Sequence, residues 1–158
     1  MRVENGEQMQ LDDTANILAE ATFFDVCDAE QRRLLAFAAE RKKYRPGSII
    51  YASGDVPEGA HVLISGTVAT TQDSAPNDPV VQHVAGTLIG LSSLVLAKPR
   101  PLTIKAVDTV ETLMVPRAAF MKLARQYPDL AERAAARLKG ELAGFLGTVA
   151  EMRGRIRE

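Results

Sequence analysis

The chain has 158 residues and a formal charge of −1, from 19 Lys and Arg against 20 Asp and Glu. This length suits one domain with a sizeable core, and the balanced charge argues against a protein built to lie on nucleic acid or an anionic membrane. The single cysteine, Cys27, excludes an intrachain disulfide and the several thiolates of an iron–sulfur or structural zinc site. With acidic residues near the N-terminus and no apolar run of membrane-spanning length, we expect a cytoplasmic protein with no membrane contact.

Two short helices are predicted in residues 11–43, within the segments 11–24 and 28–43. In the second segment, Asp28 and Gln31 have the spacing of a capping box, in which each side chain accepts a hydrogen bond from the other residue's backbone. An apolar stripe follows at helical spacing, made of Leu34, Leu35, Phe37 and Ala38.

From residue 44 to residue 116 the hydrophobic period becomes that of strands. Short β-branched runs are separated by turn pairs such as Pro46-Gly47 and Gly54-Asp55. Many short strands at close spacing predict a small antiparallel roll or barrel. The expected fold is therefore α+β: an antiparallel β roll of the jelly-roll or double-stranded β-helix kind, flanked by N-terminal helices and a long C-terminal helix.

Helical periodicity returns at residue 117. A helix over 116–127 stops at Pro128, and a second begins at Pro128 or Asp129. In this last helix, apolar residues recur at spacings of four and three, at Ala131, Ala135, Leu138, Leu142, Phe145, Val149, Met152 and Ile156. This heptad seam predicts a coiled coil, most simply a parallel homodimer, with Arg133 and Arg137 on its outer face. The alternative is an amphipathic helix packed on its own domain.

Several local sequences carry a family resemblance: "YRPGSIIYASGD", "HVLISGTV", "GTLIGLSSLVLAKPR" and "TIKAVDTVETLMVPRAAFMKLARQYPDL". Together with the order of the elements, they resemble the cyclic-nucleotide-binding domain of catabolite-activator-type bacterial regulators, from about Phe23 onward. The resemblance implies a helical extension over 1–22, a β-roll domain over 23–127 and a dimerisation helix over 128–158. It also implies that glycines hold the tight turns of the roll, at Gly47, Gly54, Gly66, Gly86 and Gly90.

The same resemblance places a ligand site at Gly90, Leu91, Ser92 and Ser93, with Arg100 as the arginine. In ligand-binding members, backbone N–H groups at the start of a short helix receive the cyclic phosphate, and an arginine pairs with its oxygens. Two alternatives concern the same residues. The serines suit a cap of the short helix, and Arg100 suits an ordinary surface arginine.

Two residues depart from the pattern of the ligand-binding members, and a third, Phe145, concerns the contact to the base. Leu91 replaces a glutamate that accepts a hydrogen bond from the ribose 2′-hydroxyl, and a buried hydroxyl left unpaired there costs about 1 to 3 kcal/mol. Pro101 follows Arg100 and has no N–H for a second phosphate contact. Phe145 falls on the position that reads the base, where its ring would stack on a purine or fill the pocket.

Two functions remain open. The first is a ligand-sensing regulatory domain that binds a small anionic ligand, with cyclic AMP and cyclic GMP as candidates, and acts through its dimer helix. The second is a degenerate domain used for dimerisation or protein interaction. The residues show no nucleophile elbow, Walker loop or paired acids, and His61 and His83 lack ligand spacing, so we expect no enzyme, no resident cofactor and no metal. No winged helix-turn-helix follows the last helix, so we expect no DNA binding by this chain alone.

Overall fold

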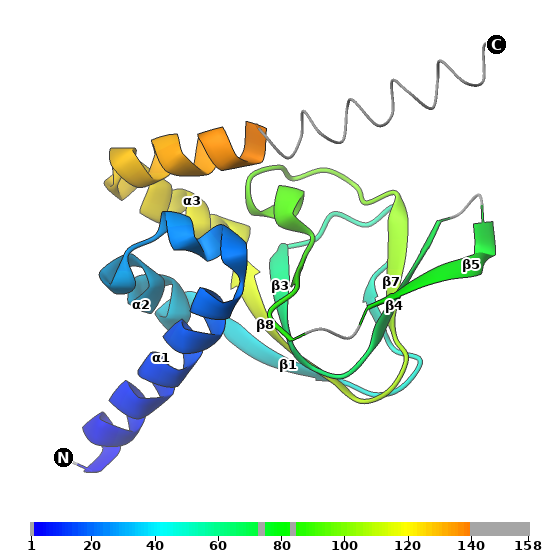
Figure 1. Cartoon of the computed structure of the whole chain (residues 1–158), viewed down its shortest axis with the longest axis horizontal. Coiled ribbons are helices and arrows are strands. Elements are labelled where there is room, and N and C mark those ends of the chain that lie inside the picture. Colours follow the sequence, from blue (N-terminus) through cyan, green and yellow to red (C-terminus); the bar gives the residue numbers. More distant parts are fainter. Residues whose placement is uncertain (1, 73–74, 83–84, 140–158) are drawn as a thin grey trace.

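Two four-stranded antiparallel sheets form a β roll, and a layer of helices covers one side of it (Figure 1). The computed structural model describes residues 2–72, 75–82 and 85–139. The first sheet, called here the helix-side sheet, has the strand order β1 (Glu40–Tyr44), β8 (Val110–Pro116), β3 (Gly59–Ser65) and β6 (Leu88–Ile89). The second has the order β2 (Ile49–Tyr51), β7 (Leu102–Ala106), β4 (Val68–Gln72) and β5 (Ala75–Gln82). The predicted antiparallel roll is confirmed.

The helices precede and follow the roll in the predicted order. The N-terminal group is α1 (Arg2–Glu20), the 3₁₀ turn η1 (Thr22–Val26) and α2 (Ala29–Ala38); α3 (Arg117–Gln126) follows β8, and residues 128–139 are helical. Among the helices of the described residues, none has the length and apolar character needed to cross a membrane.

The helix-side sheet separates two cores. On β3, Ala60 and Val62 belong to the core beneath the helices, whereas Leu63 belongs to the core inside the roll. On β8, Leu113 lies on the helical side and Val110 on the roll side. This two-residue alternation is the ordinary geometry of a strand. The helices and the roll interior therefore share one wall.

The capping box at the start of α2 is confirmed. Oδ1 of Asp28 accepts a hydrogen bond from the backbone N–H of Gln31 at 2.8 Å, and Oε1 of Gln31 accepts one from the backbone of Asp28 at 2.9 Å. The predicted apolar stripe is only partly correct, because Leu35 is buried while Leu34 and Phe37 are 46% and 79% exposed.

The predicted extension of this helix to Lys43 is wrong. The helix ends at Ala38, and residues 40–44 form β1, which pairs with β8 in the register Glu40↔Met114 to Tyr44↔Val110. The backbone hydrogen bonds offered by β8 come from a segment far along the chain. They override the helical pattern of the local sequence.

The five glycines assigned to turns of the roll all have positive φ, as predicted, and no other glycine of the described residues does. At Gly66, φ is 95° and a Cβ would lie 2.4 Å from the carbonyl oxygen of Thr109. The turn between β3 and β4 therefore requires glycine both for its backbone conformation and for space.

The helix over 128–139 packs on its own domain through Leu130, Ala134 and Leu138, which are buried in the core beneath the helices. Of the predicted seam, Ala131 is half-buried and Ala135 is exposed. The seam residues from Leu142 to Ile156 lie outside the described residues, so the coiled coil stays a prediction.

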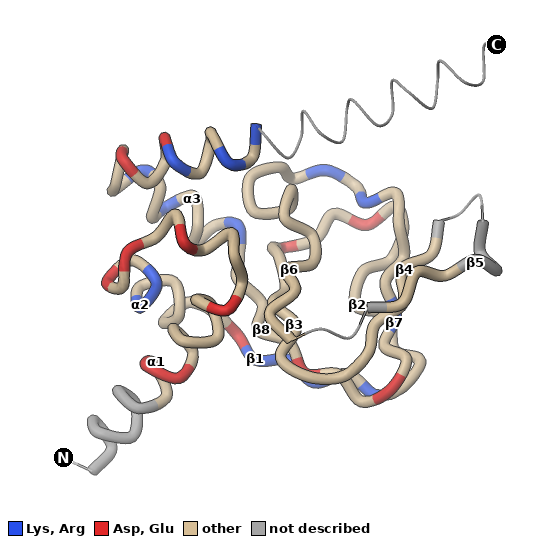
Figure 2. The backbone as a smooth tube through the Cα atoms, viewed as in Figure 1, with Lys and Arg blue, Asp and Glu red and all other residues tan. Residues whose placement is uncertain are grey.

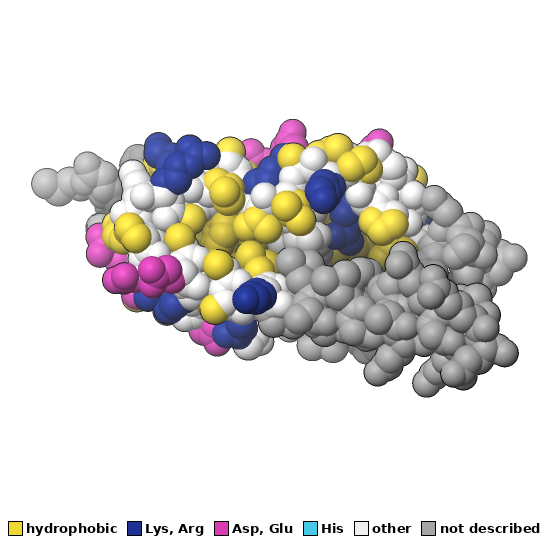
Figure 3. Space-filling view, turned by 90° about the horizontal axis from the view of Figure 1, so that it is seen from above, with side chains coloured by type: hydrophobic (Ala, Val, Ile, Leu, Met, Phe, Trp, Pro, Cys, Tyr) yellow, Lys and Arg dark blue, Asp and Glu magenta, His cyan; other side chains and the backbone are white. Residues whose placement is uncertain are grey.

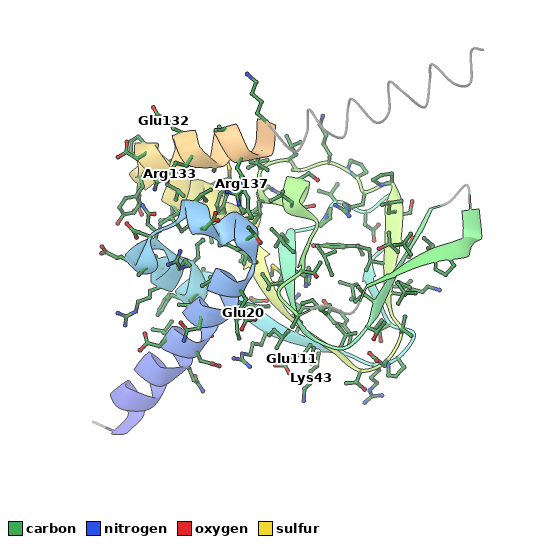
Figure 4. All side chains as sticks on the ribbon, viewed as in Figure 1. Glu20, Lys43, Glu111, Glu132, Arg133 and Arg137 are labelled. Carbon is green, nitrogen blue, oxygen red and sulfur yellow. The ribbon has the colours of Figure 1, made fainter. Side chains whose placement is uncertain are left out.

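Two arginines that the prediction placed on the outer face of that helix contact η1. Nε of Arg133 donates to the carbonyl of Val26 at 2.9 Å, and Arg137 donates to the carbonyl of Thr22 at 3.1 Å and pairs with Asp25 (Figure 4). Both side chains reach η1. Burial of Leu130, Ala134 and Leu138 orients the helix so that the adjacent face, which carries the two arginines, lies against η1. Polar contacts therefore reinforce the apolar docking of this helix.

Candidate functional site

The predicted ligand segment forms a short cassette between β6 and β7. Gly90, at φ 78° and ψ 39°, turns the chain from β6 into the 3₁₀ helix η2 (Leu91–Leu94), and the backbone N–H of Ser93 donates to the carbonyl of Gly90 at 2.9 Å. The alternative in which Ser92 and Ser93 cap this helix is wrong. Both lie inside η2, the residue at its N-cap is Gly90, and no side-chain hydrogen bond caps it.

Tyr51 lies directly beneath the start of the cassette. Its hydroxyl donates to the carbonyl of Gly59 at 2.7 Å, and the carbonyl of Ile89 lies 3.4 Å from the same oxygen. A Cβ at Gly90 would approach this hydroxyl to 2.8 Å. Close packing on Tyr51 thus adds to the positive φ as a reason for glycine at position 90.

Arg100 lies over the ring of Tyr51, with its Cζ atom 5.1 Å from the ring centroid. Its backbone is fixed by two hydrogen bonds to the loop between β2 and β3, one from the N–H of Gly54 at 2.8 Å and one to the carbonyl of Asp55 at 3.0 Å. The side chain is half-buried, and Nε is fully buried without a hydrogen-bond partner among the described residues. Arg100 is therefore held against the roll, in contrast to a freely solvated surface arginine.

The loop around Arg100 is basic and partly apolar. Between η2 and β7 the chain carries Lys98 and Arg100 and no acidic residue (Figure 2). Val56 and Leu96, in the two loops that the backbone bonds of Arg100 join, are 49% and 38% exposed. Figure 3 shows hydrophobic side chains beside basic ones on the face seen from above. The loop that carries Val56 also carries the exposed Asp55 and Glu58, so the positive charge that would attract an anion comes from the segment between η2 and β7.

Behind Tyr51, the roll interior contains a buried polar pair. Nδ1 of His61 lies 2.8 Å from Oγ1 of Thr112, and the His61 ring meets the Tyr51 ring edge-on at 5.1 Å. Burial, with a smaller effect of Lys42, lowers the pKa of His61 to about 4, so this imidazole is neutral at physiological pH. Burial also raises the pKa of Tyr51. The cluster is uncharged apart from Arg100.

Leu91 and Pro101, the two predicted departures from the family pattern, have different surroundings. The Leu91 side chain packs against the core beneath the helices and lines a cleft of about 430 Å³ together with Phe23 and Gly86. Pro101 is exposed at the entry to β7. Phe145 and His83 lie outside the described residues.

Arg117 joins the cassette to the helical layer. This residue is the first of α3, and its Nη1 donates to the carbonyl of Pro57 at 2.8 Å and to that of Ser93 at 3.2 Å. η2 is therefore linked to the start of α3 by a hydrogen bond.

Sequence reasoning missed Tyr51 and Thr112, and it considered His61 only as a metal ligand. All three point into the roll from strands whose alternation was recognised, so the available signal was a polar or aromatic residue at an inward position. The pairing of β3 with β8 sets His61 opposite Met114, two residues from Thr112 on the same strand. That register could not be deduced from local sequence.

The fold and the cassette define a class: a β-roll regulatory domain with an arginine-bearing segment between two strands. The chain matches the cyclic nucleotide-binding domain family over residues 41–127 and belongs to that family.

Relatives agree with this membership. The chain is 27% identical over 101 residues to the cAMP-dependent protein kinase regulatory subunit of Dictyostelium discoideum. The match covers 61% of this chain and 31% of that subunit. A cyclic nucleotide-binding-like protein from Brucella abortus is 27% identical at a TM-score of 0.60, covering 72% of this chain and 99% of that one. The sensor domain of the transcriptional regulator DNR from Pseudomonas aeruginosa is 16% identical, with a TM-score of 0.70 and coverage of 93% and 95%, and shows the fold alone.

Proposed function

We propose that this chain is a non-enzymatic, cytoplasmic sensing domain that binds a small anionic ligand, with cyclic AMP and cyclic GMP as candidates. The ligand lies at Arg100 and the cassette from Gly90 to Ser93. The observation that carries the proposal is the buried Nε of Arg100, which has no hydrogen-bond partner among the residues described.

A buried N–H donor without a partner costs about 1 to 3 kcal/mol. An anionic oxygen that accepts from Nε would remove this cost and form a charge-assisted hydrogen bond, the stronger kind. The segment between η2 and β7 contains no carboxylate that would compete with a ligand for the guanidinium of Arg100. The family supports a phosphate as the anion, because its members include subunits named for dependence on cyclic AMP.

The response to the ligand would pass through η2. Leu91 contacts the core beneath the helices, and the carbonyl of Ser93 accepts from Arg117 at the start of α3. A ligand that contacts η2 more favourably in one of two arrangements would shift the population toward that arrangement. In a homodimer formed through residues 128–158, such a shift would change how the two protomers cross.

Calorimetric titration of cyclic AMP and cyclic GMP tests this proposal with the wild type, Arg100→Ala and Lys98→Ala. Lys98 is exposed in the same loop and serves as the matched control for loss of a positive charge. We expect Arg100→Ala to weaken binding by about tenfold to a hundredfold, and Lys98→Ala by less than about threefold. Millimolar nucleotide that gives neither heat nor a rise in melting temperature with the wild type would contradict the proposal.

A second function is favoured by Leu91 and Pro101. Leu91 packs toward Phe23 and has no acceptor for a ribose hydroxyl, and Pro101 has no N–H for a phosphate. These two residues suit a domain that keeps the fold but serves dimerisation or protein interaction. Silent titrations combined with a stable dimer in sedimentation would support this function over the first.

A further inference from the structure

We propose that Tyr51 is a positioning residue of the anion site: its ring holds the guanidinium of Arg100, and its hydroxyl ties that ring to β3 and the start of the cassette. The inference rests on the proposed function for its ligand, cyclic AMP, but the contact itself exists without ligand and is tested separately below.

The ring and the guanidinium are placed for a cation–π contact. The Cζ atom of Arg100 lies 5.1 Å from the ring centroid of Tyr51, within the range where the negative face of an aromatic ring attracts a cation. This contact strengthens where water is excluded, and Tyr51 is only 6% exposed. The ring thus supports one face of the guanidinium, while Nε is buried without a hydrogen-bond partner among the described residues.

Tyr51 is itself fixed from three directions. Its hydroxyl donates to the carbonyl of Gly59, the carbonyl of Ile89 lies 3.4 Å away, and the ring of His61 meets it edge-on at an interplanar angle of 86°. His61 is in turn held by Thr112. The ring is therefore a rigid platform, built from β2, β3 and β6, under a long and otherwise flexible side chain.

A fixed platform lowers the entropic cost of ligand binding. An arginine side chain has many rotamers, and ordering them on binding weakens affinity. Because the ring already restricts the guanidinium before the ligand arrives, removal of the ring should weaken binding even though Arg100 remains. Removal of the hydroxyl alone keeps the ring face and should have a smaller effect.

The first arm of the test measures cyclic AMP affinity by calorimetry in Tyr51→Leu, Tyr51→Phe and the control Tyr44→Phe. Tyr44 packs beside the same interior, with its ring 6.2 Å from that of His61. We expect Tyr51→Leu to weaken binding by about tenfold, Tyr51→Phe by less than about threefold, and Tyr44→Phe not at all. A folded Tyr51→Leu that binds within twofold of the wild type would overturn the inference.

The second arm needs no ligand and also serves if Tyr51→Leu does not fold. The chain has three tyrosines and no tryptophan, so near-ultraviolet absorbance reports tyrosine surroundings directly. We expect Arg100→Ala to shift the tyrosine band in the wild-type and Tyr44→Phe backgrounds but not in Tyr51→Phe. A shift that persists in Tyr51→Phe, or no shift in any background, would overturn the inference. A shift of the expected pattern in a protein that binds no nucleotide would contradict the proposed function alone.

Discussion

Leu91 shows how one residue can separate two parts of ligand recognition. Its side chain lies with Phe23 against the core beneath the helices, whereas Arg100 lies over Tyr51 on the roll. The positions that the resemblance assigns to the phosphate and to the ribose therefore pack against different parts of the molecule. In the proposed site Arg100 would supply the phosphate contact, and the apolar Leu91 stands where the resemblance places the ribose acceptor.

This replacement predicts tolerance of a missing hydroxyl. We expect 2′-deoxy cyclic AMP to bind the wild type within about threefold of cyclic AMP, because Leu91 offers the 2′-hydroxyl no acceptor. Leu91→Glu should create a preference of about tenfold for the ribonucleotide, and Leu96→Glu, in the exposed part of the same segment, should not. Competition binding measures all three. A wild type that already favours the ribonucleotide tenfold would show that another residue holds the hydroxyl.

His61 predicts a stability loss in acid. Its pKa lies at about 4 in the folded chain and near its ordinary value when unfolded, so the unfolded state binds the proton first as pH falls. The contribution is complete above about pH 6.5 and disappears as pH falls through 4, up to roughly 3 kcal/mol in all. Urea unfolding between about pH 7 and pH 4 measures it. His61→Gln should flatten this dependence, and an equally steep dependence in that variant would assign it to other groups.

At the scale of elements, the local sequence was sufficient to predict features that depend on contacts between residues close in the chain. The capping box of α2 and the positive-φ turns, such as that at Gly66, follow from a few adjacent residues, and both were predicted correctly. The end of α2 at Ala38 and the cap of η2 were not, because β8 and Tyr51 act on them from distant positions in the chain.

The capping box predicts a measurable share of stability. Asp28→Ala removes the acceptor for the N–H of Gln31 and should lower the free energy of unfolding by about 1 kcal/mol. Glu30→Ala, an exposed change in the same first turn, is the matched control and should have little effect. Chemical denaturation of the two variants compares them directly. Equal losses would mean that the carboxylate acts through the helix dipole and not through the cap.

The helix over 128–139 gives a second element-scale prediction through two adjacent alanines. Ala134 is 3% exposed in the core, and Ala135 is exposed. Ala134→Leu should therefore cost about 1 to 3 kcal/mol by overpacking, whereas Ala135→Leu should leave the stability of the domain nearly unchanged. Thermal unfolding distinguishes them. If both variants lose stability equally, this helix does not dock as described.

For the whole molecule, the sequence predicted the roll and its cassette but not the meeting of distant segments. The stack of Arg100 on Tyr51 depends on how β2, β7 and the cassette come together, and the bonds of Arg133 and Arg137 depend on the docking of the last helix against η1. These contacts are set by strand order and helix packing. Hydrophobic periodicity indicates which face is buried but not what it is buried against.

The oligomeric state is predicted from the apolar seam of the last helix. The heptad seam predicts a homodimer at tens of micromolar in sedimentation, and Val149→Asp, at a seam position, should produce a monomer. Glu151→Lys, off the seam, should leave the dimer intact. A wild type that sediments as a monomer would favour a last helix that serves only its own domain.

The helix-side sheet has a further consequence for how such a protein can diverge. Because successive residues of β3 and β8 belong alternately to two cores, the roll interior and the helical layer draw on different residues of the same strands. Substitutions at inward positions, such as His61, can alter what the roll accepts while Ala60 and Val62 continue to seat the helices. Residues that line the roll interior can therefore change during evolution while the packing of the helices on the same sheet is kept.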